Sequence, residues 1–268
     1  MSEEADRLKL SRFYGEMTSL DAVVRAVTAE GLDPDRVNAA DLYTRGLDCH
    51  NLGGFPQLEV IAAAVERIGV PRPGDAVLDL GCGMGGPGRF VADRFGCRVV
   101  GVDLVEARIE TARALAELTR CTDRVEYRTG DATGLPFEKG SFAQVWMLDA
   151  SVHVRDKGTL LREIARVLRP GGLLVLHDQM GPLSRAMLPL MRRAPWVAPP
   201  LTQLVNRAEE AGLRLMLWQD TTQLVREFFR KIQERMADAP INALLAAYLK
   251  TLGSPEGRTG LLIAQRRV

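Results

Sequence analysis

The sequence predicts an α/β protein built on an open, mostly parallel seven-stranded sheet, with helices on both faces and a helical lid. Two observations carry this prediction. Between residues 76 and 177, short apolar runs alternate with longer stretches of helical periodicity, which is the pattern of βαβ units. A glycine-rich turn at residues 81–88 directly follows the first of these runs. Such a turn joins a strand to a helix at the carboxyl edge of a parallel sheet.

Each strand is predicted from an apolar run bounded by turn or helix signals. Helices are expected to begin near Gly86, Val105 and Gly158. The run Arg169-Pro170-Gly171-Gly172 should stop the third of these helices and turn the chain into the next strand. A further amphipathic helix is expected at Leu201–Gly212. The seven strands are expected at Ala76–Leu80, Arg98–Asp103, Arg124–Thr129, Ala143–Leu148, Leu173–His177, Leu213–Asp220 and Thr259–Arg266.

Two helical regions lie outside this sheet pattern. Residues 1–70 are expected to form an N-terminal helical lid region, and residues 71–268 the sheet domain, with a helical insertion at about residues 222–247. Because these pieces bracket the sheet in sequence, we expect them to fold over its carboxyl edge. The apolar lid helices also favour a homodimer.

Composition and charge exclude several classes of protein. The net charge of +1 lacks the basic excess that nucleic-acid binding uses. The polar N-terminus and the short apolar runs predict neither a signal peptide nor a membrane span. The four cysteines show no Cys-x-x-Cys spacing, and the three histidines show no metal-ligand spacing. We therefore expect a cytoplasmic protein without a metal site.

The strongest chemical signal is the glycine turn. The first strand runs into Gly81-Cys82-Gly83-Met84-Gly85-Gly86, where glycines let the backbone approach a ligand closely. Gly81, Gly83 and Gly86 also fit the loose G-x-G-x-x-G pattern of dinucleotide sites. Asp79 precedes the turn, where its charge would repel a pyrophosphate but help to hold a cation. The turn therefore favours a positively charged nucleoside over a nicotinamide dinucleotide.

Two further carboxylates end the next strands. Asp103 is placed to accept hydrogen bonds from both hydroxyls of a ribose. Asp131 follows the third strand, where it would accept a hydrogen bond from an adenine amine. A single aspartate at a strand end is usually a turn or cap residue. Three at successive ends of one sheet edge, beside a glycine turn, indicate a nucleoside site.

Four blocks of sequence resemble the class I S-adenosylmethionine-dependent methyltransferases in order and spacing: VLDLGCGMGG, VVGVDL, GDATGLPFEKGSFAQVW and EIARVLRPGGLLVLHD. The resemblance covers residues 70–180 and is to the subgroup that acts on sterols, tocopherols and quinone precursors. It implies a Rossmann-like fold with S-adenosylmethionine as cofactor. It also implies that Asp79, Gly81 and Gly83 hold the methionine moiety, Asp103 the ribose, and Asp131 and Ala132 the adenine, with Cys82, Leu104, Leu148 and Tyr43 completing the cofactor pocket.

His153 is the candidate general base. A phenol, enol or activated carbon must lose a proton on methylation, and an imidazole titrates in the right range. His153 lies just beyond the fourth strand, which in the resembled family borders both the cofactor sulfur and the acceptor pocket. The alternative is that His153 orients the lid or contacts the acceptor without moving a proton.

Other candidates are expected at the acceptor pocket and its cover. His177 follows the fifth strand, and Met180 begins a methionine-rich stretch that would line an apolar pocket. Packing onto the sheet or a dimer surface is the more ordinary explanation of that stretch. Tyr43 and His50 loosely match the segment that closes over the cofactor in the resembled family. They would otherwise only pack the lid.

The predicted function is transfer of a methyl group from S-adenosylmethionine to carbon, oxygen or nitrogen of a small, apolar or aromatic metabolite. The alternative is a protein that keeps the fold but catalyses a reaction such as cyclisation, or only binds its ligand. A nicotinamide-dependent oxidoreductase is disfavoured by Asp79. A DNA-base methyltransferase is disfavoured because Leu148-Asp149-Ala150-Ser151 stands where those enzymes carry an Asn/Asp-Pro-Pro-Tyr/Phe motif.

Overall fold

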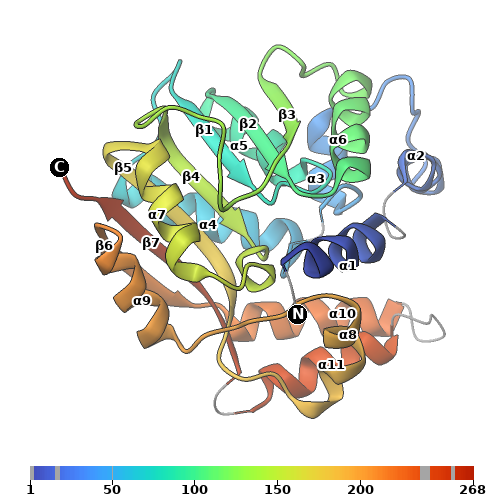
Figure 1. The fold of residues 1–268 in the computed structure, drawn as a ribbon. Coiled ribbons are helices and arrows are strands. Elements are labelled where there is room, and N and C mark those ends of the chain that lie inside the picture. The colour runs from blue at the N-terminus through green and yellow to red at the C-terminus, as the bar shows by residue number, and fades with distance from the viewer. Residues whose placement is uncertain (1–2, 16–18, 50, 236–241, 255–256) are drawn as a thin grey trace.

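The computed structural model describes residues 3–15, 19–49, 51–235, 242–254 and 257–268 (Figure 1). Its centre is a seven-stranded sheet of order β3-β2-β1-β4-β5-β7-β6. β7 runs antiparallel to both of its neighbours, and every other adjacent pair is parallel. The predicted fold class is therefore confirmed. The strands are β1 Ala76–Leu80, β2 Arg98–Asp103, β3 Val125–Thr129, β4 Phe142–Leu148, β5 Leu168–Met180, β6 Leu213–Asp220 and β7 Arg258–Arg266.

Helices connect and cover these strands, and several begin at the residues that helix capping requires. Asn38 and Asp41 form a capping box at the start of α3. The Asp156 side chain accepts a hydrogen bond from the backbone N–H of Thr159 at the start of α7. The helices are α1 Glu3–Gly15, α2 Leu20–Ala29, α3 Ala39–Arg45, α4 Gly54–Ile68, α5 Gly86–Phe95, α6 Glu106–Leu118, η1 Ser151–His153, α7 Lys157–Val167, η2 Arg185–Met187, α8 Leu188–Arg193, α9 Leu201–Glu210, α10 Thr222–Arg235 and α11 Asn242–Leu252.

The fifth strand differs from the prediction at both ends. β5 begins at Leu168, directly after α7, so the Pro-Gly-Gly run that was expected to be a turn lies within the strand. Gly171 has a φ of 76°, and the β4–β5 register shifts nearby, between Phe142 and Gln144. At the other end, pairing with the antiparallel β7 extends β5 to Met180. That partner lies about 80 residues further along the chain, so local sequence did not reveal it.

Helices cover both faces of the sheet. On one face, α4, α5 and α6 pack their apolar residues against the sheet, with Leu58, Ile61 and Ile109 fully buried. On the other face, α7 and α9 pack through residues such as Ile164 and Leu204. The N-terminal region is therefore divided, because α4 belongs to the sheet core whereas α1 does not.

A third apolar cluster, here called the cap cluster, joins α1, η2, α10 and α11; α10 and α11 lie in the lower part of Figure 1, with α1 above them. Leu10 and Phe13 of α1 pack in it with Met187, Phe229 and Tyr248. α1 comes from the start of the chain and α11 from near its end, so the cluster closes only in the folded protein. It lies beside the carboxyl edge of the sheet, where the site is found.

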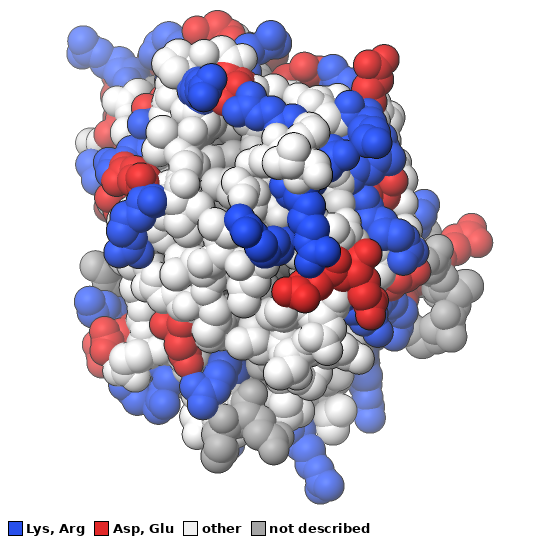
Figure 2. Space-filling view, turned by 90° about the vertical axis from the view of Figure 1, so that its left-hand side faces the viewer, with Lys and Arg blue, Asp and Glu red and all other residues white. Residues whose placement is uncertain are grey.

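The surface carries mixed charges. On the face drawn in Figure 2, basic side chains stand among acidic and uncharged ones. Among the residues that the structure describes, we find no helix with the length and apolar character needed to cross a membrane.

Candidate active site

One pocket opens at the carboxyl ends of β1, β2 and β4, beneath α1. Its walls come from the glycine turn, from the ends of β2 and β3, from the loop after β4 and from α1. Eight of the ten residues predicted for cofactor binding line it, among them both carboxylates Asp103 and Asp131, and so does His153. The lining residues include Arg7, Leu10, Tyr14, Asp48, Asn51, Gly81, Cys82, Gly83, Met84, Asp103, Leu104, Arg108, Asp131, Ala132, Leu148, Asp149, His153 and Arg155.

The glycine turn has a shape that other residues would not adopt. Gly81 and Gly83 have φ values of 76° and 55°, in the left-handed region. A Cβ on Gly81 would lie 2.3 Å from the Cβ of Ala150, so the loops after β1 and β4 pass in direct contact. The turn therefore brings bare backbone to the pocket wall.

The two predicted carboxylates face the pocket in different ways. Asp103 accepts hydrogen bonds from the backbone N–H of Gly83 and of Val105, both at 2.9 Å, so it ties the glycine turn to the end of β2. Asp131 is more exposed, with its side chain at 26%, and pairs with Arg7 of α1. Because a carboxylate accepts about four hydrogen bonds, both can still accept a ligand hydroxyl or amine.

Asp79 lies outside the pocket lining, contrary to the role predicted for it. It is 3% exposed and sits under the turn, where a Cβ on Gly88 in the first turn of α5 would lie 2.9 Å from its Oδ2. Burial, and secondarily the carboxylate of Asp103, raise the pKa of Asp79 to about 7. Its contacts therefore support the turn from below.

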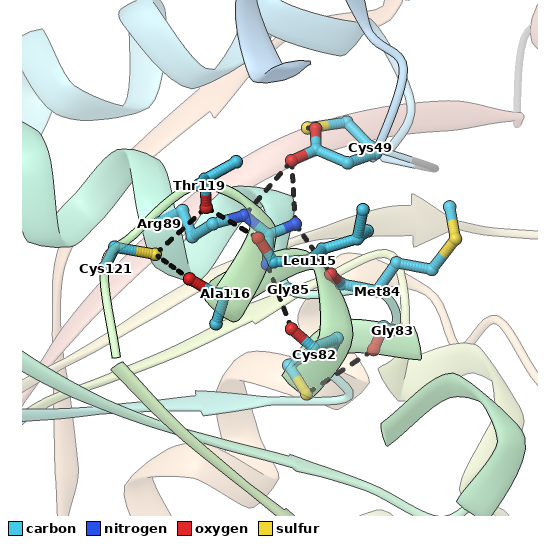
Figure 3. A network of polar contacts seen from close by, with 12 residues as sticks. Cys49, Cys82, Gly83, Met84, Gly85, Arg89, Leu115, Ala116, Thr119 and Cys121 are labelled. Atoms are coloured by element: carbon cyan, nitrogen blue, oxygen red, sulfur yellow. Dashed lines mark hydrogen bonds and ion pairs between the residues drawn. The ribbon is translucent and has the colours of Figure 1, made fainter. Parts of the chain in front are cut away.

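A buried ion pair fixes the glycine turn to the preceding segment. Arg89 of α5 and Asp48 have fully buried side chains, with 2.7 Å between Arg89 Nη2 and Asp48 Oδ2. The same nitrogen donates to the carbonyl of Met84 at 2.7 Å, as Figure 3 shows. Arg89 also donates to the hydroxyl of Tyr127, which in turn donates to the carbonyl of Gly85. The guanidinium thus bonds the turn directly at Met84 and through Tyr127 at Gly85.

His153 ends the short helix η1 in the loop after β4. Its Nδ1 is 2.7 Å from the carbonyl of Pro195 and its Nε2 is 2.6 Å from the hydroxyl of Tyr14. A carbonyl only accepts, so Nδ1 carries the proton and Nε2 accepts from Tyr14. Burial lowers the pKa of His153 to about 4, against the opposing effect of the Pro195 carbonyl. The ring is therefore neutral at pH 7.

Lys157 and Asp178 hold η1 from two sides. The Lys157 Nζ donates to the carbonyls of Ser151 and Val154, both at 2.5 Å. Asp178 accepts from the Ser151 hydroxyl at 2.6 Å and from the backbone N–H of Val152 at 3.0 Å. Burial lowers the pKa of Lys157 to about 8, while burial and then the nearby Asp149 raise the pKa of Asp178 to about 6. The pair orients the loop that carries His153.

Asp149 adopts a left-handed backbone conformation, with φ 57°, at the end of β4. Its side chain accepts from the backbone N–H of Leu52 at 2.6 Å and contacts Nδ1 of His177 at 2.9 Å. The strained residue is thus held by groups on two other segments, as strained residues at functional sites commonly are.

The N-terminal helix α1 closes the pocket. Its Tyr14 lies edge-on to His153 and under the guanidinium of Arg108, whose Cζ is 4.6 Å from the Tyr14 ring centroid. Two ion pairs, Arg7–Asp131 and Asp6–Arg155, link α1 to the loops after β3 and β4. The cover of the pocket is therefore polar at its rim and aromatic at its centre.

Three residues predicted near the ligand lie elsewhere. The Tyr43 hydroxyl donates to Asp93, and its ring stacks on Phe55. His177 is fully buried between Asp149 and Thr221, and Met180 packs in the sheet core on the α7 side. All three side chains therefore make contacts that hold the fold together. The direction of a side chain depends on tertiary packing, which its position in the sequence does not reveal. His50 lies outside the described residues.

Sequence reasoning missed the groups that α1 supplies. Tyr14 meets His153 across 139 residues of sequence, and no local pattern marks that contact. Arg108 and Asp149 gave weak signals, since one lies in the first turn of α6 and the other directly follows a strand, as Asp103 does. Among the described residues, no group of three or more His, Cys, Asp or Glu side chains is arranged to hold a metal ion.

Comparison with known proteins agrees with this site. Residues 77–172 match the family model described as "Methyltransferase domain". The 27-O-demethylrifamycin SV methyltransferase of Amycolatopsis mediterranei is 35% identical over 171 residues, which cover 61% of this chain and 63% of that protein. This chain therefore carries a methyltransferase domain, at residues 77–172. S-adenosylmethionine is accordingly its cofactor.

Solved structures share the fold of this methyltransferase. Geranyl diphosphate C-methyltransferase from Streptomyces coelicolor A3(2) has a TM-score of 0.71 at 22% identity, covering 79% of this chain and 78% of that one. The [4+2]-cyclase SpnF also matches, with a TM-score of 0.68 at 22% identity, covering 79% and 82%. The chain spans about half the length of the first curated relatives it matches, from 40% to 63%.

Proposed function

We propose that this methyltransferase transfers a methyl group from S-adenosylmethionine to a small, apolar or aromatic metabolite. The observation that carries the proposal is the pocket itself, which places the glycine turn, Asp103 and Asp131 opposite a neutral histidine paired with a tyrosine. The cofactor supplies a methyl group on a sulfonium, which is already a good leaving group. The chain's task is then to position the acceptor, exclude water and accept a proton.

The residues present fit the cofactor. Gly83 lets the guanidinium of Arg108 approach the turn at the pocket wall, since a Cβ there would lie 2.6 Å from it. Asp103 would accept from the ribose hydroxyls and Asp131 from the adenine amine. Gly81, Cys82, Leu104, Ala132 and Leu148 would line the rest of the nucleoside site. A carboxylate-rich wall suits a cation better than a pyrophosphate.

His153 would accept the acceptor's proton at Nε2. Its Nδ1–H is fixed on the Pro195 carbonyl, and its Nε2 lone pair accepts from the hydroxyl of Tyr14, which also lines the pocket. The proton would therefore pass by way of Tyr14, whose hydroxyl would take up the acceptor's proton as it gives its own to Nε2. A base with a pKa near 4 is too weak to ionise an alcohol or phenol beforehand. It is strong enough to take the proton as the oxygen is alkylated, when that proton becomes very acidic.

The lid would consist of α1 with α10 and α11, which correspond to parts of the regions 1–70 and 222–247 assigned to it above, although α11 runs on to Leu252. Support comes from the cap cluster, which joins these helices over the pocket, and from the ion pairs that α1 makes with Asp131 and Arg155. Arg7 bonds the carboxylate assigned to the adenine, so this ion pair and the nucleoside would share Asp131.

Location and partners follow from the same features. A cytoplasmic protein is supported by four free, buried cysteines, which suit a reducing compartment. A small-molecule acceptor, and not nucleic acid, is supported by the net charge of +1 and the mixed surface. A homodimer through the lid helices is part of the proposal, and sedimentation analysis would test it.

The second candidate is a reaction without methyl transfer, such as cyclisation, favoured by the fold shared with the cyclase SpnF. Formation of S-adenosylhomocysteine in step with product would support the first candidate. Turnover of an acceptor without any S-adenosylhomocysteine would support the second.

Binding of the cofactor is the direct test of the site. Asp103→Ala should weaken S-adenosylhomocysteine binding by about 1.5–3 kcal/mol for each charge-assisted bond removed, measured by calorimetry. Glu126→Ala, at an exposed ion pair on β3, is the matched control and should leave the affinity unchanged. Equal affinities for the wild type and Asp103→Ala would contradict the assignment.

A further inference from the structure

Two buried polar groups beside the site have no hydrogen-bond partner among the described residues. They are the indole Nε1–H of Trp196 and the hydroxyl of Tyr248. Tyr248 is only 4% exposed, so bulk water does not replace the missing partner. Leaving such a group unpaired in a protein interior is destabilising, because the group loses its hydrogen bonds to water and gains none in return. Two such unpaired groups on neighbouring side chains indicate that a ligand binds there.

These groups lie at the far end of a row of rings that starts in the cofactor pocket. Tyr14 and His153 line that pocket, and their ring centroids are 5.4 Å apart. His153 meets Trp196 at 5.0 Å, and Trp196 meets Tyr248 at 6.0 Å. All three contacts are edge-to-face. The row leads from the proposed base into the cap cluster.

The surroundings restrict what this end of the row can bind. The ring centroids of Phe229 and Tyr248 are 5.2 Å apart, and the cluster around them consists of apolar residues such as Leu10 and Val225. Burial, and then the nearby carboxylates of Asp149 and Asp178, raise the pKa of the Tyr248 hydroxyl. A negatively charged ligand group would be repelled here. An indole N–H only donates, so the ligand atom must be an acceptor.

We propose that Trp196 and Tyr248 form the distal end of the acceptor subsite and bind an oxygen atom of an uncharged, ring-shaped, apolar acceptor. The hydroxyl, carbonyl or ether oxygen accepts from the Trp196 indole and the Tyr248 phenol. The acceptor's apolar body extends along the row of rings from the cofactor pocket, and the atom to be methylated points to His153 and Tyr14. This inference rests on the proposed function and names the class of acceptor that the site takes.

A matched pair of probes tests the oxygen contact by calorimetry, with S-adenosylhomocysteine present. 1-Naphthol and naphthalene differ only in the hydroxyl group. The wild type should bind 1-naphthol at least about tenfold more tightly, as one well-made hydrogen bond to a buried donor provides. Trp196→Phe and Tyr248→Phe should each reduce this preference, and the double variant should bring it below about threefold. The anion 1-naphthoate should bind more weakly than 1-naphthol.

Controls separate this inference from loss of fold and from failure of the proposed function. Trp218→Phe, on β6 and packed on the other face of the sheet, should keep the full preference for 1-naphthol. Unchanged affinity for S-adenosylhomocysteine shows that a variant is folded. An equal affinity for the two probes in the wild type, a preference that persists in the double variant, or tighter binding of 1-naphthoate would each overturn the subsite. If S-adenosylhomocysteine does not bind the wild type, the proposed function fails. The affinities of 1-naphthol and naphthalene, measured without S-adenosylhomocysteine, still test whether Trp196 and Tyr248 bind an oxygen atom.

Discussion

Two loops at the carboxyl edge each depend on a buried cation, and they are built differently. The glycine turn after β1 is bonded by Arg89, whose charge is matched by Asp48 at zero exposure. The loop after β4 is bonded by Lys157, whose ammonium meets two carbonyls, with no carboxylate within ion-pair distance among the described residues. One cation is paired, and the other is only hydrogen-bonded.

The difference appears in how the two cations titrate. Tyr127 and Asp48 raise the pKa of Arg89 beyond its already high ordinary value, although burial opposes them. Burial lowers the pKa of Lys157 to about 8, close to the conditions in which the protein works. The charge of Arg89 is therefore constant over the pH range in which Lys157 titrates, and of the two buried cations only the one that holds the loop of His153 is sensitive to pH.

Removing the partner of Arg89 should have the largest effect. Asp48→Ala leaves a buried guanidinium without its counter-charge, which should lower the free energy of unfolding by about 3–5 kcal/mol in a urea titration. Glu66→Ala is the control, because it breaks the exposed pair with Arg94 and should cost no more than about 1 kcal/mol. If the two variants lost similar amounts of unfolding free energy, the buried ion pair would stabilise the protein no more than the surface pair does.

Lys157 should make stability depend on pH in the alkaline range. Its pKa falls from an ordinary 10.5 to about 8 on folding, so between these values the unfolded chain binds the extra proton. Unfolding then takes up a proton, and stability rises with pH from 8 to 10.5 by at most about 3 kcal/mol. Lys157→Met should lack this rise, as urea midpoints at both ends of the range would show. If the stability of the wild type and of Lys157→Met changed with pH in the same way, the pKa of Lys157 would not be lowered on folding.

His153→Ala should affect turnover and not the cofactor. If Nε2 takes the acceptor's proton, the rate of S-adenosylhomocysteine formation with a screened acceptor should fall by roughly a hundredfold. Affinity for S-adenosylhomocysteine should stay within about twofold, because the glycine turn and Asp103 are untouched. His153→Gln distinguishes a base from a spacer, since it keeps a polar side chain but cannot accept the proton. Near-normal turnover in both variants would leave His153 with only a packing role.

Arg7→Ala should have the smallest effect. Its side chain is 50% exposed, so losing the pair with Asp131 should change stability by less than about 1 kcal/mol. Because Asp131 is then released for the adenine, affinity for S-adenosylhomocysteine should rise modestly, by less than about tenfold. Arg25→Ala, on the surface of α2, should change neither quantity. Weaker binding in Arg7→Ala would show that Arg7 supports the nucleoside site instead of competing for it.

The sequence by itself determined the sheet and the glycine turn. β1, β2 and β6 have the predicted bounds, because an apolar run between turn signals is a local property. Asp103 and Asp131 were found at the pocket for the same reason, since the ends of parallel strands share one edge of the sheet.

The contacts around His153 and Trp196 depend on the tertiary structure. Tyr14 reaches His153 from the first helix, Arg155 pairs with Asp6 across 149 residues, and Trp196 meets Tyr248 from another loop. The tertiary contacts also place Tyr43, His177 and Met180 away from the pocket, where they pack against other parts of the fold. The physical reason is that backbone pattern follows from neighbours in sequence, whereas the direction and partners of a side chain depend on which distant surfaces pack together.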